Sequence, residues 1–246
     1  MGRVVFIGAG PGAADLITVR GAQRLAGAEV VLFDALTDPA LRVYAPNACW
    51  IDVGKRGYGA AAAQSQIDAL LVGLAQEHAV VVRLKGGDPS VFGRLEEELL
   101  ALQAAGIPCE VVPGVTAALA AAADTRRPLT RRGHGRSVSL ATAMTREGRI
   151  HAGRHADTEV FYMAGRQLPR LGRRLCQHGW DAATPVCVVS RAGWPDELHS
   201  EHRLDELARA ALLHAGRPAV VTVGAGARPV APMHKAGPLE TSQAST

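Results

Sequence analysis

The run VVVRLKGGDPSVFGR, residues 80–94, decides the fold class of this chain. Its first part, Val80–Leu84, has the length of a strand, and nearly continuous apolar character is typical of a parallel sheet covered on both faces. The turn Gly86-Gly-Asp-Pro89 follows, where glycine lets the backbone approach closely and proline turns the chain. Ligands of open α/β sheets bind at this edge, so the turn is a candidate binding loop. A plain structural turn is the alternative.

Similar short apolar runs surround this strand in the first half of the chain, at residues 4–7, 30–33, 49–53 and 110–112. Apolar residues at helical spacing lie between them, at 67–75 and 95–102. The alternation predicts an α/β layer whose crossovers are right-handed.

A second α/β unit follows a basic stretch, which we call the arginine stretch and define as residues 126–136. Strands are predicted there at 138–141, 160–163, 185–189 and 219–223, and helices at 167–178 and 204–214. We therefore expect three parts: an N-terminal α/β domain over 1–114, a C-terminal α/β domain over 115–227 and a flexible tail over 228–246.

Composition excludes several classes of protein. Apolar residues make up 48% of the 246, which is too many for a disordered chain. The 27 basic and 23 acidic residues are too balanced for a polybasic nucleic-acid protein. No apolar run reaches the roughly 20 residues of a membrane span, and we expect neither a signal peptide nor a membrane partner. The cysteines lack CxxC spacing, so we expect a cytoplasmic protein with buried, reduced thiols at Cys49, Cys109, Cys176 and Cys187.

The segment Gly8-Ala-Gly-Pro-Gly-Ala13 follows the first strand and fits the dinucleotide pattern GxGxxG/A, with Asp34 about 20 residues further on. Two features oppose NAD binding. Pro11 has no N–H to offer a pyrophosphate. Thr18 is the better N-cap, and a helix that begins there cannot aim its N-terminus at phosphates held by the glycines. A dinucleotide site and a tight turn both stay open on these grounds.

Several motifs occur together in one order: GAGPG (8–12), DVGKR (52–56), RLKGGDP (83–89), FGR (92–94), VVPGVTAA (111–118), FYM (161–163) and PAVVTVG (218–224). Over about residues 3–226 the chain resembles the tetrapyrrole methylases, which are class III S-adenosylmethionine-dependent methyltransferases, and among them the uroporphyrinogen-III C-methyltransferases.

The resemblance implies two α/β domains with S-adenosylmethionine in the cleft between them, a homodimer and no metal. It implies methylation of uroporphyrinogen III at C2 and C7, which gives precorrin-2 for sirohaem, cobalamin or haem d1 and leaves S-adenosylhomocysteine. Two alternatives are a methyltransferase for another precorrin and a degenerate copy that binds S-adenosylmethionine or a tetrapyrrole without chemistry.

Where its motif positions match the family, the resemblance implies three groups of site residues in this chain. The implied catalytic residues are Asp34, Lys55, Arg94 and Glu97. The implied cofactor-binding residues are Pro11, Gly86, Gly87, Asp88, Val91, Thr116, Ala117, Met163, Ala192 and Ala219. The implied substrate-binding residues are Arg131 and Arg132.

The chemistry gives these residues different tasks. Methylation of a pyrrole carbon creates positive charge and then needs a base, so Asp34 and Glu97 are the candidate carboxylates. For Glu97 a merely solvated position on the helix is the alternative. The benefit of acids in a first helical turn accounts for Glu96 and Glu98, which we expect to be solvated. The substrate carries eight carboxylates, which guanidinium groups of the arginine stretch can bind. Nucleic-acid binding, and for Arg126 and Arg127 a solvated loop, are the alternatives.

Some positions depart from the family pattern. The family usually has arginine at position 35, two glycines at 95 and 96, histidine at 131 and a glycine at 192. This chain has Ala35, Leu95, Glu96, Arg131 and Ala192 there, and Ala143 and Met144 in place of a Gly-His pair. These changes bear on turnover rate, on product profile and on activity itself, whereas the predicted fold does not depend on them.

Overall fold

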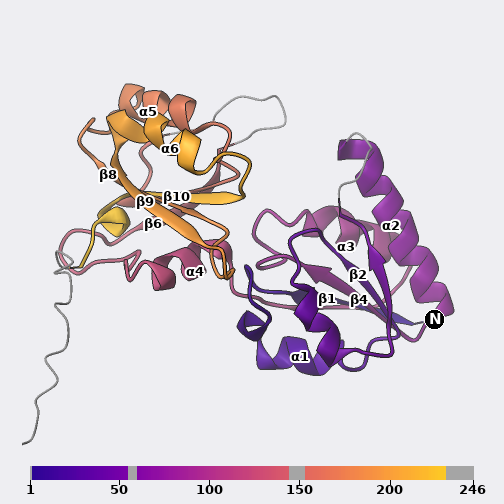
Figure 1. Cartoon of the computed structure of the whole chain (residues 1–246). Coiled ribbons are helices and arrows are strands. Elements are labelled where there is room, and N and C mark those ends of the chain that lie inside the picture. The colour runs from indigo at the N-terminus through magenta and orange to yellow at the C-terminus, as the bar shows by residue number, and fades with distance from the viewer. Residues whose placement is uncertain (1, 55–59, 144–152, 231–246) are drawn as a thin grey trace, which may run out of the picture.

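The computed structural model describes residues 2–54, 60–143 and 153–230, which form two five-stranded sheets with helices on both faces of each (Figure 1). The first sheet has the order β3-β2-β4-β1-β5, and every pair in it is parallel. Its strands are β1 (Arg3–Gly8), β2 (Val30–Phe33), β3 (Cys49–Asp52), β4 (Val80–Lys85) and β5 (Cys109–Val112). All five were predicted from their apolar runs.

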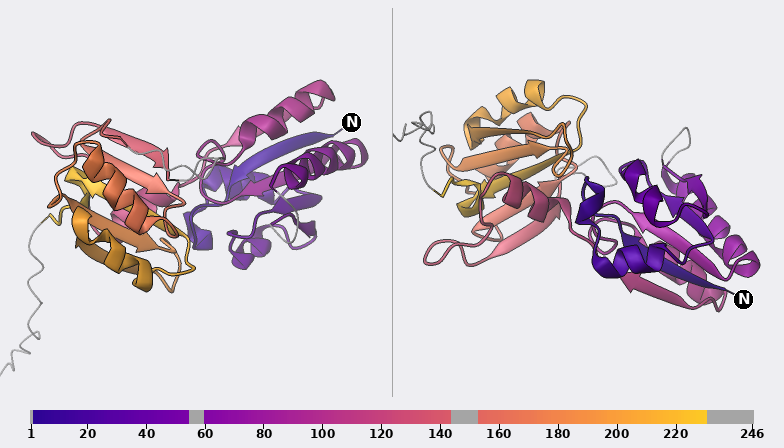
Figure 2. Two further views of the ribbon diagram at one scale, coloured as in Figure 1. Left: turned by 90° about the horizontal axis from the view of Figure 1, so that it is seen from above. Right: turned by 60° about the horizontal axis from the view of Figure 1, so that its bottom comes forward.

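Alternate residues of these strands enter two separate cores. Val4 and Phe6 pack with α2 (Ala60–Glu77) and α3 (Leu95–Ala104) on one face of the sheet. Val5 and Ile7 pack on the other face with α1 (Val19–Leu25) and the 3-10 helix η2 (Pro39–Tyr44). Figure 2 shows the two layers from further directions. Burial on both faces explains why the strands are apolar at nearly every position.

The second sheet has the order β6-β7-β10-β8-β9, and only the β6–β7 pair is parallel. Helix α4 (Ala117–Asp124) packs on one face, and α5 (Leu168–Gln177) with α6 (Leu207–Leu213) packs on the other. The strands are β6 (Val138–Thr142), β7 (Thr158–Tyr162), β8 (Pro185–Ser190), β9 (Leu198–Arg203) and β10 (Ala219–Gly224).

The sequence missed β9 and part of the cysteine pattern. Strand β9 reads LHSEHR and pairs only with β8, so as an edge strand it needs no apolar run. The expectation of buried thiols is right for Cys187 but wrong for Cys49 and Cys109, which are exposed at the first residues of edge strands β3 and β5. All four cysteines are free.

The chain passes from one sheet to the other between Val112, where β5 ends, and Ala117, where α4 begins. The predicted boundary at 114/115 falls in this connection and stays a prediction, as does the tail, of which only residues 228–230 are described. Among the described residues, no helix is both long and apolar enough to cross a membrane.

Candidate functional site

The loops that follow β1, β4 and β5 meet at the carboxyl edge of the first sheet with no room for side chains. A Cβ atom on Gly8 would lie 2.5 Å from the Cα of Gly114, and Gly87 has a φ of +71°. Gly10 and Gly87 form an isolated antiparallel bridge, in which N–H of Gly87 donates to O of Gly10 at 2.7 Å. These glycines therefore hold three loops in backbone contact.

The same contacts argue against a dinucleotide at the glycine loop. Backbone N–H groups of four loop residues already donate to acceptors within the protein: Ala9, Gly10, Ala13 and Ala14. Pro11 has no N–H. The hydroxyl of Thr18 accepts from N–H of Gly21, so α1 begins at Val19, well beyond the loop. The prediction of Thr18 as N-cap is confirmed, and the loop has few donors left for a pyrophosphate.

Asp88 ties the turn after β4 to the loop after β5. Its Oδ1 accepts from N–H of Ser90 at 2.8 Å, and its Oδ2 accepts from N–H of Gly114 at 2.8 Å. Both carboxylate oxygens thus bind backbone, and the side chain shapes the turn.

Tyr162, the last residue of β7, connects the second sheet to this edge. Its hydroxyl lies 2.7 Å from Oγ1 of Thr116 and accepts from N–H of Ala118 at 3.2 Å. Its ring packs on that of Phe92, with centroids 5.0 Å apart. Burial raises the pKa of Tyr162, with the negative charge of Asp88 adding to the effect, so the phenol stays protonated.

A second connection joins the segment after β8 to the glycine loop. Indole Nε1 of Trp194 donates to O of Pro11 at 3.0 Å, and N–H of Ala13 donates to O of Gly193 at 2.6 Å. The guanidinium of Arg191 lies 4.3 Å from the Trp194 ring centroid. We call the region where these two connections meet the junction.

Backbone strain is concentrated beside the junction. Among the described residues, five other than glycine have a positive φ, and four of them flank it: Phe92, Arg94, Met163 and Arg191, at +54° to +56°. Such conformations cost about 1–3 kcal/mol each and persist where the surrounding structure enforces them, which is common at functional sites.

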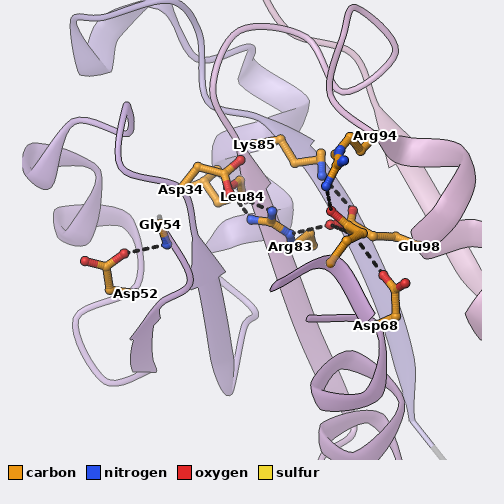
Figure 3. A network of polar contacts seen from close by, with 10 residues as sticks. Asp34, Asp52, Gly54, Asp68, Arg83, Leu84, Lys85, Arg94 and Glu98 are labelled. Carbon is orange, nitrogen blue, oxygen red and sulfur yellow. Dashed lines mark hydrogen bonds and ion pairs between the residues drawn. The ribbon is translucent and has the colours of Figure 1, made fainter. Parts of the chain in front are cut away.

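Four charged residues form a network beneath this edge (Figure 3), which we call the buried charge network. Guanidinium Nη2 of Arg83 lies 2.6 Å from Oδ1 of Asp34, and its Nε lies 3.1 Å from Oε1 of Glu98. Oε2 of Glu98 lies 2.7 Å from Nζ of Lys85. Glu98 is fully buried, Arg83 and Lys85 are nearly so, and the Asp34 side chain is 33% exposed.

The electrostatic environment of the two cations differs. Burial disfavours the charge of Arg83, but Asp34 and Glu98 together raise its pKa above the ordinary value. Burial and the neighbouring Arg83 lower the pKa of Lys85, against the opposing effect of Glu98. The two cations thus differ in the net direction of their shifts, although Glu98 favours the charged form of both.

The predicted catalytic residues have different environments. Asp34 directly follows β2 and belongs to the network. Glu97 and Arg94 lie 3.9 Å apart, and both are nearly half exposed. Lys55 lies outside the described residues. The expectation that Glu98 is a solvated acid is wrong: successive helical positions turn by about 100°, so Glu98 points inward from α3 while Glu97 points out.

All ten predicted cofactor-binding residues lie on connections at the junction. Pro11 follows β1, Gly86–Val91 follows β4, and Thr116 with Ala117 begins α4. Met163 follows β7, Ala192 follows β8 and Ala219 begins β10 at the same end of the second sheet, since Ala219 pairs with Ser190. The structure brings these positions together, and their role in binding stays a prediction.

The predicted substrate-binding residues lie elsewhere. O of Leu129 accepts from Oγ1 of Thr158, which begins β7, whereas Tyr162 at the junction ends that strand. Arg131, whose guanidinium donates to O of Arg228, and Arg132 are close to this far end. The fold of a single chain therefore does not bring the arginine stretch close to Asp34.

Arg127 differs from its neighbours and corrects an expectation. It is buried, not solvated: its guanidinium donates to Sγ of Cys187 at 3.4 Å and pairs with Glu201. Arg126 and Arg132 are exposed.

Two cavities are lined by described residues. One, of about 540 Å³, lies along the turn at Pro89–Leu95 and the outer face of α3, beside the junction. The other, of about 430 Å³, lies next to Trp180 and Asp157 at the far end of the second sheet.

Comparisons with known proteins agree with this geometry. The model of the Tetrapyrrole (Corrin/Porphyrin) Methylases matches residues 3–208. The chain belongs to this family. Siroheme synthase 1 of Serratia proteamaculans is 42% identical over 229 residues, and the siroheme synthase of Azotobacter vinelandii is 42% identical over 231. Each alignment covers 91% of this chain but 48% and 50% of the relative, so the chain spans about half the length of these curated relatives.

Solved structures confirm the two-domain α/β fold of this tetrapyrrole methylase. Uroporphyrin-III C-methyl transferase from Thermus thermophilus, complexed with S-adenyl homocysteine, is 37% identical with a TM-score of 0.80, covering 91% of this chain and 97% of that one. Cobalt precorrin-4 methyltransferase is 28% identical, also with a TM-score of 0.80, covering 92% of this chain and 96% of that one.

Sequence reasoning about this tetrapyrrole methylase missed Arg83, Lys85, Glu98 and Tyr162. One signal was available, because Arg83 and Lys85 are two apart in an otherwise apolar strand. Two cations on one face of a buried strand require an acidic partner, and α3 with its three glutamates follows directly. No comparable signal marks Tyr162.

Proposed function

We propose that this tetrapyrrole methylase transfers methyl groups from S-adenosylmethionine to C2 and C7 of uroporphyrinogen III, giving precorrin-2 and S-adenosylhomocysteine. The observation that carries the proposal is the likeness to the Thermus thermophilus uroporphyrin-III C-methyl transferase whose structure contains S-adenyl homocysteine. The siroheme synthases, which are about 42% identical, support the same reaction. The proposal concerns only the part of those relatives that this chain matches.

The residues at the junction fit a ligand of this kind. Gly86 and Gly87 have no side chains, and Asp88 turns its carboxylate onto backbone, so the turn after β4 offers mainly main-chain groups. The alanines at 117, 192 and 219 leave the opposite connections small, and Met163 is an exposed apolar side chain at the end of β7. When bound there, S-adenosylmethionine supplies an activated methyl group.

The protein's own contribution is placement and proton transfer. Contacts across the junction, of Tyr162 with Phe92 and of Trp194 with Pro11, hold the two sheets relative to each other, which positions a methyl donor and its acceptor without further ordering. Asp34 stands at the carboxyl edge with its carboxylate oriented by Arg83. We assign it the role of stabilising the positive charge that develops on the pyrrole ring and of accepting the ring proton.

Binding of the eight substrate carboxylates requires cations. Arg94, nearly half exposed beside the turn after β4, is a candidate in the same chain. We propose that the protein acts as a homodimer, in which the arginine stretch of one copy faces the site of the other. The dimer is tested by light scattering, which measures the masses of the native protein and of an Arg131→Ala/Arg132→Ala variant.

We also propose a cytoplasmic location, which the free cysteines support.

The reaction itself is tested with purified protein, S-adenosylmethionine and uroporphyrinogen III under anaerobic conditions, read by mass spectrometry. We expect a product heavier by two methyl groups. The variant Asp34→Asn, which keeps the size of the side chain, is expected to lose at least about 100-fold in rate. Binding of S-adenosylmethionine without methyl transfer would instead identify a degenerate copy.

A second candidate function is methylation of a different precorrin. The cobalt precorrin-4 methyltransferase superposes on this chain as well as the Thermus protein does, although its identity is lower. The same assay with a panel of precorrins distinguishes the two, because transfer to another precorrin and none to uroporphyrinogen III supports this second candidate.

A further inference from the structure

The buried charge network connects helix α3 to the end of β2 through a continuous chain of hydrogen bonds. Oε1 of Glu98 accepts from Nε of Arg83 at 3.1 Å and from Nε2 of Gln64 at 3.4 Å. Nη1 of Arg83 donates to O of Leu84 at 3.2 Å, and Nη2 donates to Oδ1 of Asp34 at 2.6 Å. Each nitrogen of the Arg83 guanidinium is thus bound, and the planar group cannot rotate without breaking several bonds (Figure 3).

Stability alone does not account for such a network. Taking ions out of water costs several kcal/mol each, and well-packed apolar residues often replace a buried ion pair without loss. The network nevertheless places Arg83, Lys85 and Glu98 among the apolar residues of β4 and α3. Its arrangement indicates a further role, which is to fix the position of the group that the Arg83 guanidinium binds.

What the guanidinium holds is the carboxylate of Asp34, the most exposed member of the network. Arg83 binds Oδ1, so Oδ2 is the oxygen that can meet a substrate at the carboxyl edge of the sheet. Because Arg83 is itself held by Glu98, the position of Oδ2 depends on a carboxylate on another element.

We propose that Glu98 is a positioning residue for methyl transfer, which holds the Arg83 guanidinium and through it the carboxylate of Asp34. The inference rests on the proposed function, in which Asp34 is the base. Nζ of Lys85 lies 2.7 Å from Oε2, the second carboxylate oxygen of Glu98, and balances its charge.

The test compares Glu98→Gln with Glu77→Gln, an exposed acid that ends α2. A displacement of about 1 Å in a reacting group costs on the order of 100-fold in rate, so we expect kcat of Glu98→Gln to fall by about 10–100-fold. The Kd of S-adenosylhomocysteine by calorimetry should change by less than about twofold, and Glu77→Gln should match the native enzyme. A kcat for Glu98→Gln equal to that of Glu77→Gln overturns the proposal.

A charge-balanced variant separates positioning from loss of stability. Glu98→Gln/Lys85→Met removes one acid and one base, so it relieves the uncompensated cation and should unfold at nearly the native urea concentration. If Glu98 positions Arg83, kcat stays low in this variant, because Nε of Arg83 still lacks its charged partner. Full recovery of kcat would show that Glu98 only balances charge and would overturn the proposal.

A crystal structure of Glu98→Gln provides a result independent of the reaction. We expect the Asp34 carboxylate to leave its native position, even if the native protein methylates another precorrin. If the native protein has no methyltransferase activity, the proposed function is contradicted. The position of the Asp34 carboxylate in Glu98→Gln then still tests whether Glu98 holds Asp34 through Arg83. An unmoved Asp34 carboxylate together with a low kcat would contradict the positioning role.

Discussion

The buried charge network and the arginine stretch are two concentrations of charge in this protein, and they behave in opposite ways. The network has two acids and two bases, is largely buried, and lies at the edge of the first sheet where the loops meet. The arginine stretch is far denser in the sequence, yet its arginines lie at the far end of the second sheet and, apart from Arg127, reach the surface. Density of charge along the chain therefore predicts a charged surface but not its place in the fold.

The largest effect that distinguishes the two groups is expected for Arg83→Met. Methionine keeps the apolar stem but removes the cation that binds Asp34 and Glu98, and breaking a buried ion pair costs about 3–5 kcal/mol. The free energy of unfolding in urea measures the loss. Arg132→Met is the matched control, and equal losses in the two variants would erase the distinction between the groups.

Arg127→Met should give an intermediate effect, because this residue has the position of the arginine stretch and the burial of the network. Its partner Glu201 is 49% exposed and can be hydrated once the guanidinium is gone. We expect a loss of about 1–2 kcal/mol, in the range of a hydrogen bond to a charged group. Urea unfolding checks it, and a loss above that for Arg83→Met would contradict the ranking by burial.

Glu197 provides a smaller effect that depends on pH, because this acid shares a hydrogen bond with another acid, Asp124. Burial and a hydrogen bond to Asp124 raise the pKa of Glu197 to about 7, against 4.5 for an ordinary glutamate, while N–H of Gly193 opposes the shift. His199 lies 3.8 Å away.

The folded protein therefore binds more protons than the unfolded chain between about pH 4.5 and 7. The stabilisation that comes from the protonated carboxyl of Glu197 is present below pH 4.5 and is lost as the pH rises through about 7. The free energy of unfolding of the native protein should therefore fall with pH over this range, with a slope that corresponds to up to one proton. We expect Glu197→Gln to remove this slope. An identical slope in the variant and the native protein would contradict the shared proton.

Arg132→Ala should have the smallest effect on stability, within about 0.5 kcal/mol, as for most exposed substitutions. If the arginine stretch meets substrate carboxylates, KM for uroporphyrinogen III rises several-fold while the Kd of S-adenosylhomocysteine stays the same. Steady-state kinetics and calorimetry give the two numbers, and an unchanged KM would remove the stretch from substrate binding.

The sequence predicted the first sheet more completely than the second because parallel strands buried on both faces leave a continuous apolar run. Strand β9, with Leu198 as its single aliphatic residue, leaves none. The site was predicted through motifs, which placed Asp34 and Asp88 at the right edge. That Glu98 rather than Glu97 turns inward could have been predicted from spacing, because Glu98 lies three residues after Leu95 and four before Leu102, on the apolar face of the helix.

The roles of Tyr162 and Arg127 were beyond sequence reasoning for a related reason. Tyr162 acts on Thr116, 46 residues away, and Arg127 acts on Cys187, 60 residues away. Such contacts depend on how α4 and the segment after it pack on the strands of the second sheet, which no local pattern encodes.

The most direct test of the account is a crystal structure of the protein with S-adenosylhomocysteine. We predict that the ligand contacts the turn after β4 at Gly86–Val91 and the start of α4 at Thr116 and Ala117, with Met163 and Ala219 on the opposite side. A ligand bound instead in the cavity beside Trp180 and Asp157, with the junction empty, would contradict the assignment of the site.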